Sequence, residues 1–220
     1  MIDVLVERDD NPTEDELKLL RKQNTAADIA LFGRMLASSP AFNVEAAAQV
    51  AHAISVHKVA VEDDFFTAVD DLNNGEEDMG AAHMGETEFA AGLFYQYICV
   101  DRELLKDNLR DDANLAKATI SAMFEAAMTV APSGKQNSFA SRARASYALC
   151  EVGSQQPRSL SVAFLKPIVG DDVLNESISS LNKTVANMDK AYGDCADFRS
   201  VMNIETGEGS LQSILATATE

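Results

Sequence analysis

The spacing of apolar residues along this chain predicts long helices in its second half. Between residues 172 and 192, apolar side chains recur at alternating intervals of four and three residues, which is the spacing of one helix face. Either Asp171 or Asp172 is placed to cap this helix. A second helix is predicted from Asp112, as N-cap, to Ala131, and shorter ones over 13–24 and 101–109. The long stripe consists of Leu174, Ile178, Leu181, Val185, Met188 and Tyr192.

Alternation of apolar and polar residues predicts strands elsewhere. The strands fall over 28–35, 50–59, 89–99 and 142–152, and a helix is the alternative for the first of them. Arg142 and Arg144 stand two positions apart in the last strand, so we expect them on one face. Residues 70–87 are acidic and lack periodicity, which is typical of a loop or hairpin tip. The residues from Met202 onward are expected to be loosely held. The fold class that follows is α+β.

Composition and charge change this picture in one respect. The 220 residues carry a formal net charge of −17, which on its own argues against nucleic-acid binding. The charge is uneven, because residues 131–170 hold five basic residues against Glu151 alone. Three widely spaced cysteines, with no signal peptide or membrane span, suit a reducing cytoplasm. The five basic residues are Lys135, Arg142, Arg144, Arg158 and Lys166.

The sequence offers no constellation for catalysis, a metal or a cofactor. His52 and His57 are five positions apart and would point to opposite faces of a strand. The doubled aspartates are placed as helix caps or as solvated acids, and no hydrolase or nucleotide-binding motif occurs. The turn over 133–136 lacks the spacing of a phosphate loop, although its amides and Lys135 are suited to contact a phosphate. We therefore expect a protein that is not an enzyme.

Two adjacent aromatic residues stand out. Phe65 and Phe66 lie between Glu62-Asp63-Asp64 and Asp70-Asp71, so the middle of a buried strand is an unfavourable place for them. Paired aromatics at the base of a protruding loop stack on bases or wedge between them. The alternative is that they pack the loop onto its own domain. The residues alone leave both interpretations open.

A series of ordered motifs points to a known family. Over roughly residues 25 to 170, the chain closely resembles the CasC-type backbone subunit of the type I-E CRISPR surveillance complex, Cascade. The resemblance rests on the motifs DIALFGRM (28–35), AHAISVH (51–57), FTAVDDL (66–72), AHMG (82–85), Glu88-Phe89, Phe94-Tyr95, Gly134-Lys135-Gln136 and Arg158-Ser159-Leu160.

The resemblance implies an RRM-like (ferredoxin-like) palm with a protruding β-hairpin thumb. The palm would comprise 25–58 and 87–220, the thumb 59–86, and residues 1–24 would be a remnant of the helical finger region. The implied function is non-catalytic: several copies stack along the guide RNA spacer and present its bases for pairing with target DNA. The implied partners are the guide (crRNA) spacer, further copies of the chain, other Cascade subunits and, through pairing, target DNA.

The resemblance also suggests which residues bind RNA. Met35 would contact RNA from the palm, and Lys135 and Gln136 from the loop. The thumb would contribute Phe66, Thr67 and Val69, and Phe65 stands where relatives often carry another aromatic. Arg142 and Arg144 join this set on the charge pattern rather than on the family motif. Such contacts suit a subunit that must bind any spacer sequence, because they reach phosphate, sugar and ring faces and avoid base edges.

One departure from the family qualifies these expectations. Relatives begin with a palm strand and basic residues that have no counterpart before Thr13, so the fold is expected to be truncated at its N-terminus. An unpaired sheet edge and exposed apolar surface would follow. Two other functions remain as alternatives: a truncated protein-interaction module that keeps subunit contacts without binding RNA, and a metal-dependent nuclease that uses the aspartate pairs.

Overall fold

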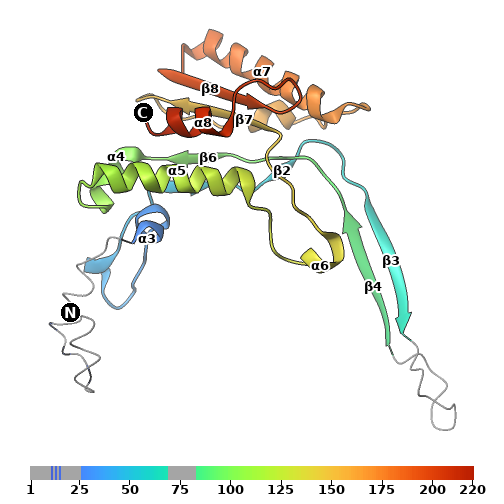
Figure 1. Cartoon of the computed structure of the whole chain (residues 1–220), viewed down its shortest axis with the longest axis horizontal. Coiled ribbons are helices and arrows are strands. Elements are labelled where there is room, and N and C mark those ends of the chain that lie inside the picture. Colours follow the sequence, from blue (N-terminus) through green and yellow to red (C-terminus); the bar gives the residue numbers. More distant parts are fainter. Residues whose placement is uncertain (1–10, 12, 14, 16–25, 69–82) are drawn as a thin grey trace. The chain divides into compact units, whose positions relative to one another are not determined.

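The chain folds into short antiparallel sheets and helices, which confirms the α+β class (Figure 1). The computed structural model describes residues 11, 13, 15, 26–68 and 83–220. These residues form two compact units. Unit 1 comprises 1–51, 98–158 and 192–220, and unit 2 comprises 52–97 and 159–191. The division into finger, palm and thumb stays a prediction.

Within the described ranges, unit 1 contains two strand pairs and several helices. Strand β1 (Ala48–Val50) pairs with β6 (Ile98–Val100), and β7 (Tyr147–Val152) pairs with β8 (Phe198–Asn203). The helices are α3 (Ala27–Phe32), α4 (Arg102–Asn108), α5 (Ala113–Thr129) and α8 (Leu211–Ala218), with the single turn α6 (Gln136–Phe139) after α5. Their small and branched apolar side chains form one core: Ala30, Leu31, Ala47, Ala48, Leu105, Leu109, Ala116, Ile120 and Ala218.

Aspartate caps begin two helices of unit 1, and the cap at Asp112 was predicted. The Asp101 carboxylate accepts a hydrogen bond from the Leu104 amide at 3.0 Å and begins α4. Asp112 does the same for the Leu115 amide at 2.9 Å and begins α5. Each cap satisfies one of the backbone donors that have no partner in the first turn of a helix.

Unit 2 contains a hairpin, a short strand pair and a long helix. The hairpin is β3 (Val61–Ala68) paired with β4 (His83–Ala90), and the short pair is β2 (Ile54–Ser55) with β5 (Phe94–Tyr95). Helix α7 (Val173–Tyr192) follows Asp172, whose carboxylate accepts a hydrogen bond from the Asn175 amide. Its buried side chains Ile178, Leu181 and Val185 belong to the predicted stripe, so the centre of the stripe is confirmed. The last member of the stripe, Tyr192, is 88% exposed, and the prediction of a buried position there is wrong.

A short 3₁₀ helix, η2 (Ser161–Phe164), completes unit 2. The Leu160 amide donates to the Tyr95 hydroxyl at 2.9 Å, and the Tyr95 and Phe164 ring centroids lie 5.4 Å apart. Ser180 of α7 donates its hydroxyl proton to the Ala163 carbonyl. His57 accepts from the Leu93 amide through Nε2, so this half-buried histidine has a structural role.

The strand predictions were wrong in extent, and one was wrong in kind. Residues 28–32 lie in helix α3, the alternative for this segment, instead of in a strand, and Gly33 ends the helix with a φ of +76°. The strands predicted over 50–59 and 89–99 are each broken into shorter pieces, because successive pieces pair with different partners. Strand β7 begins only at Tyr147.

The C-terminal region was also predicted wrongly, because it is ordered. Ser210 and Ser213 each accept a hydrogen bond from the other's amide through their hydroxyls, which forms a capping box at the start of α8. The α8 side chains Ile214, Leu215 and Ala218 are buried, and the helix contacts β7, β8 and α5. Burial of this apolar face holds the segment in place. The helix predicted over 13–24 lies outside the described residues.

Candidate nucleic-acid interface

The hairpin β3–β4 has two chemically different faces. The register places Phe65 opposite Glu86 and Phe66 opposite Gly85. Because side chains alternate along a strand and directly opposed residues share a face, Phe65 and Phe66 point to opposite sides of the ribbon. Thr67 shares the face of Phe65. The predicted contact Val69 lies outside the residues that the structure describes.

The Phe66 ring lies over Gly85. A Cβ atom on Gly85 would come within 2.7 Å of the ring's Cζ, so the absence of a side chain there makes room for the ring. The ring nevertheless remains 41% exposed. Thr87 and Phe89 lie on the same face, opposite Asp64 and Glu62. We call this side of the hairpin the aromatic face.

The Phe65 side is the acidic face. Phe65 is 61% exposed, and its nearest positions along and across the strands are Asp63, Glu86 and Glu88. These carboxylates are exposed, and none forms an ion pair within the described part of the chain. A phosphate backbone approaching this side would meet three negative charges close to the ring. The aromatic face places only one acid, Asp64, directly beside Phe66.

Lys135 is displayed by a turn with unusual backbone geometry in unit 1. Its φ of +51° and ψ of +29° are left-handed, and Ala140 at the other end of α6 has a φ of +48°. Such values cost a non-glycine residue about 1–2 kcal/mol and are often found at functional sites. The Lys135 side chain is exposed, and its Nζ lies 5.6 Å from the Phe139 ring centroid.

Gln136 has a structural role that sequence reasoning missed. Its side-chain amide nitrogen donates to the carbonyls of Pro132 and Ser141, which closes the loop around α6. No sequence motif signals this, because the bonds depend on how the loop closes. Gln136 therefore acts on the shape of the turn that carries Lys135.

Arg142 and Arg144 are exposed, as an RNA contact requires, but they are not on a strand. They lie in the irregular segment between α6 and β7, which is tied to the end of α5 by a bond from the Ala145 amide to the Met128 carbonyl. The prediction of a strand face with two arginines is therefore wrong. Neither arginine forms an ion pair among the residues described. With Lys135 they supply three exposed cations in a segment, 126–150, that contains no acid.

Met35 lies in unit 1, three residues after the end of α3. Its side chain is 85% exposed. The backbone just before it is fixed, because Arg34 and Val44 exchange both of their amide–carbonyl hydrogen bonds at 2.9 Å. The structure thus presents Met35 to solvent from an anchored segment, as a contact with a ligand requires.

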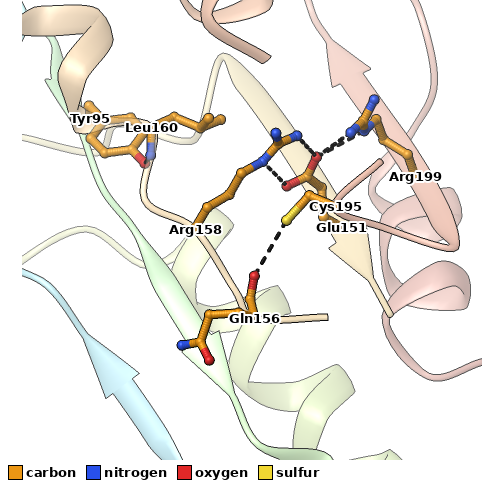
Figure 2. Close-up of polar contacts among 7 residues, drawn as sticks. All are labelled: Tyr95, Glu151, Gln156, Arg158, Leu160, Cys195 and Arg199. Atoms are coloured by element: carbon orange, nitrogen blue, oxygen red, sulfur yellow. Dashed lines mark hydrogen bonds and ion pairs between the residues drawn. The ribbon is translucent and has the colours of Figure 1, made fainter. Parts of the chain in front are cut away.

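Arg158 differs from the other basic residues, because its charge is neutralised internally (Figure 2). Its guanidinium donates to the Glu151 carboxylate at 2.8 and 3.3 Å, and Arg199 of β8 donates to the same carboxylate at 2.6 and 2.9 Å. The Arg158 side chain is only 12% exposed. These ion pairs attach Arg158, in the segment after β7, to Glu151 of β7 and, through it, to β8. Arg158 is therefore not positioned as an exposed phosphate ligand.

Burial raises the pKa of the nearby Cys150 thiol to about 11, and the Glu151 carboxylate adds to the rise. The thiol therefore stays protonated at neutral pH and is not an activated nucleophile. In the ranges that the structure describes, no three His, Cys, Asp or Glu side chains are grouped to hold a metal ion. No helix within these ranges is both long and apolar enough to cross a membrane.

Comparisons with known proteins identify relatives. The chain is similar to a chain of a CRISPR RNA-guided surveillance complex, pre-nicking, with 30% identity and a TM-score of 0.82 over 94% of this chain. It is also similar to a chain of a second CRISPR RNA-guided surveillance complex, with 32% identity and a TM-score of 0.74 over 93% of this chain. The alignments cover 58% of the first relative and 78% of the second.

A search of curated proteins gave no match. The family model described as CT1975-like protein matches residues 4–218, which is nearly the whole sequence. This match and the 32% identity to a surveillance-complex chain agree with the resemblance found in the sequence motifs. The chain belongs to the CT1975-like protein family.

Proposed function

We propose that the chain is a non-catalytic backbone subunit of a CRISPR surveillance complex, of the type I-E kind, and that it binds guide RNA. The similarity to chains of RNA-guided surveillance complexes over more than nine-tenths of this chain carries the proposal. Several copies would stack along the spacer and present its bases to target DNA. Other Cascade subunits would complete the assembly, with an RRM-like palm as the common framework.

The described residues supply two kinds of contact that suit this role. Lys135, Arg142 and Arg144 are exposed cations without ion-pair partners, as phosphate contacts require. The aromatic face offers Phe66 as a ring on which any base can stack. Both contacts are independent of base identity, which a subunit serving many spacers needs. We assign the hairpin's RNA contact to Phe66, because the acids around Phe65 repel phosphate.

The cationic segment provides the first test. The variant Lys135→Asn/Arg142→Gln/Arg144→Gln removes three charges, and asparagine tolerates the left-handed backbone of position 135. Binding of a single-stranded RNA is measured by fluorescence anisotropy at several salt concentrations. The slope of log affinity against log salt is expected to fall by roughly 2, since each neutralised phosphate of a single strand contributes about 0.7.

A matched control removes three exposed lysines elsewhere, with Lys58, Lys117 and Lys190 each changed to Gln. It should lower affinity only slightly and leave the slope near that of the wild type. Equal effects of the two triple variants would reject the assignment of the site. Absence of any salt-dependent RNA binding by the wild-type chain would favour the protein-interaction module instead.

The position under the Phe66 ring provides a second test. Gly85→Ala adds a Cβ that would collide with the ring, so the ring must move. RNA affinity is expected to fall although the aromatic residue is still present. Combining Gly85→Ala with Phe66→Leu should add nothing to the loss caused by Phe66→Leu, because both changes act on one contact. Additive losses in this double-mutant cycle would contradict the role of Gly85.

A further inference from the structure

A histidine side chain connects the two chain segments at the root of the hairpin. The ladder between β3 and β4 ends at the pair Val61 and Ala90. Backbone pairing resumes below it, where the Val56 amide donates to the Leu93 carbonyl at 3.0 Å. Among the described residues, no backbone hydrogen bond crosses the interval between these two points. The imidazole of His57 crosses it instead.

Both nitrogens of the His57 ring take part in this connection. Nε2 lies 3.1 Å from the amide nitrogen of Leu93, on the segment that leaves β4, and Nδ1 lies 3.1 Å from the carbonyl oxygen of Lys58, on the segment that enters β3. A backbone amide can only donate and a carbonyl can only accept, so Nε2 carries no proton and Nδ1 carries one. The two contacts therefore require the same neutral tautomer.

Unit 2 holds the backbone around the ring in place. Ile168 forms a parallel bridge with His57, and its amide donates to the Val56 carbonyl at 2.8 Å. Val56 is 2% exposed, whereas His57 is half-buried and can exchange a proton with solvent.

Charged side chains surround this position, but the ring is bonded to backbone atoms. Its hydrogen bonds within the described part of the chain go to the Lys58 carbonyl and the Leu93 amide. The segment 91–97 contains no charged residue. The charged side chains of the other neighbouring elements are Lys58, Glu62 and Glu88 around the hairpin root, Lys166 near Ile168, and Glu176 and Lys183, which line a groove together with Ile168.

We propose that His57 is a positioning residue for the hairpin and that its protonation releases the hairpin root. A proton on Nε2 turns the acceptor into a donor that faces the Leu93 amide, which is also a donor, so this hydrogen bond is lost. The Lys58 contact remains, since Nδ1 keeps its proton. The ring then stays bonded to the segment that enters β3 and loses the segment that leaves β4.

The consequence for RNA binding rests on the proposed function. The hairpin carries Phe66, so its orientation decides whether the Phe66 ring reaches a base. A hairpin that samples several orientations spends less time in the one that binds, and the apparent affinity falls by that fraction. Loss of one hydrogen bond corresponds to a change of up to about tenfold. We expect this loss between about pH 8 and pH 5, the interval in which histidine side chains change charge.

NMR of the RNA-free chain tests the contact directly. The His57 nitrogen shifts should show the Nδ1–H tautomer at about pH 8, and the Leu93 amide should shift as the ring is protonated. His57→Gln keeps an acceptor near the position of Nε2 that does not titrate in this interval, so its Leu93 amide should not follow pH. His52→Gln, at an exposed histidine of the same unit, should titrate as the wild type does. A neutral ring with its proton on Nε2, or a wild-type Leu93 amide that ignores pH, overturns the proposal.

Binding of a short single-stranded RNA supplies the functional measurement. The affinity of the wild type is divided by that of His57→Gln at each pH, so that effects of pH on the RNA and on other groups cancel. The ratio should be near one at about pH 8 and fall by up to about tenfold at about pH 5. His57→Asn keeps a donor near Nδ1 but is too short to reach Leu93, and should bind weakly at both values. A constant ratio, or full affinity of His57→Asn, shows that the hairpin does not depend on His57.

Failure of the proposed function gives a different result. A wild-type chain that binds no RNA at any pH overturns that function, and the NMR titration still decides the role of His57. The amides of β3 and β4 should then broaden at low pH in the wild type and stay sharp in His57→Gln. Identical behaviour of the two chains would overturn the release of the hairpin.

Discussion

Replacing Phe66 with alanine is expected to weaken the binding of a short single-stranded RNA by about tenfold or more, whatever its sequence. Stacking of a base on an aromatic ring contributes about 1–3 kcal/mol in alanine substitutions. The ring is 41% exposed on the aromatic face, with Gly85 beneath it, so one of its faces is covered and the rest is accessible to a base. Fluorescence anisotropy with RNAs of different composition measures the loss.

Substitutions of graded chemistry show whether stacking is the cause. Phe66→Tyr keeps the ring and should bind RNA nearly as the wild type does. Phe66→Leu keeps apolar volume without a π-face and should bind almost as weakly as Phe66→Ala. Phe65→Ala, on the acidic face, should retain short-RNA affinity. If Leu binds as well as Phe at position 66, or if Phe65→Ala is the more damaging change, the aromatic face is not the RNA contact.

The second large effect is expected on stability. Glu151→Ala should lower the free energy of unfolding by about 2–3 kcal/mol, because two guanidinium groups, one of them on the largely buried Arg158 side chain, lose the carboxylate that they share. Urea denaturation followed by circular dichroism gives the change, provided that the slope of the transition is unchanged.

Two further variants locate the source of this loss. Glu205→Ala removes an exposed carboxylate in the same unit and should change stability by less than about 0.5 kcal/mol. Glu151→Gln keeps the shape of the side chain and should lose less stability than Glu151→Ala, since one amide oxygen still accepts a hydrogen bond. Equal stability of Glu151→Ala and the wild type would show that the cluster contributes nothing.

Helices with regular stripes and aspartate caps could be predicted from the sequence. The signals for α5 and α7 are local, since each cap bonds to an amide three residues later. The sequence did not decide between strand and helix for α3, because apolar residues alternate in DIALF as they do in a strand, whereas the adjacent residues Ala30 and Leu31 are both buried in the helix that forms. Tertiary packing decides between the two. The same holds for α8, whose composition suggested a loose tail but whose apolar face is buried.

The candidate site was predictable only in its exposed members. The sequence indicates Lys135, Arg142 and Arg144 through a charge pattern, and the structure places all three at the surface. The charge pattern also includes Arg158 among these cations. In the structure, however, Arg158 and Arg199 both donate to the Glu151 carboxylate, and Arg199 lies 48 positions from Glu151 in the sequence. Partners this distant in sequence are fixed by the pairing of β7 with β8, which no local pattern encodes.

The pairing of Phe66 with Gly85 also limits how the hairpin can vary in evolution or in engineering. A single inserted or deleted residue in β3 would turn every following side chain to the other side of the ribbon. It would exchange the surroundings of the two rings and would leave a bulky side chain without the space that glycine provides. We therefore expect that homologous or redesigned hairpins differ in length by even numbers of residues within each strand. Odd changes should be confined to the connection beyond Ala68 and His83.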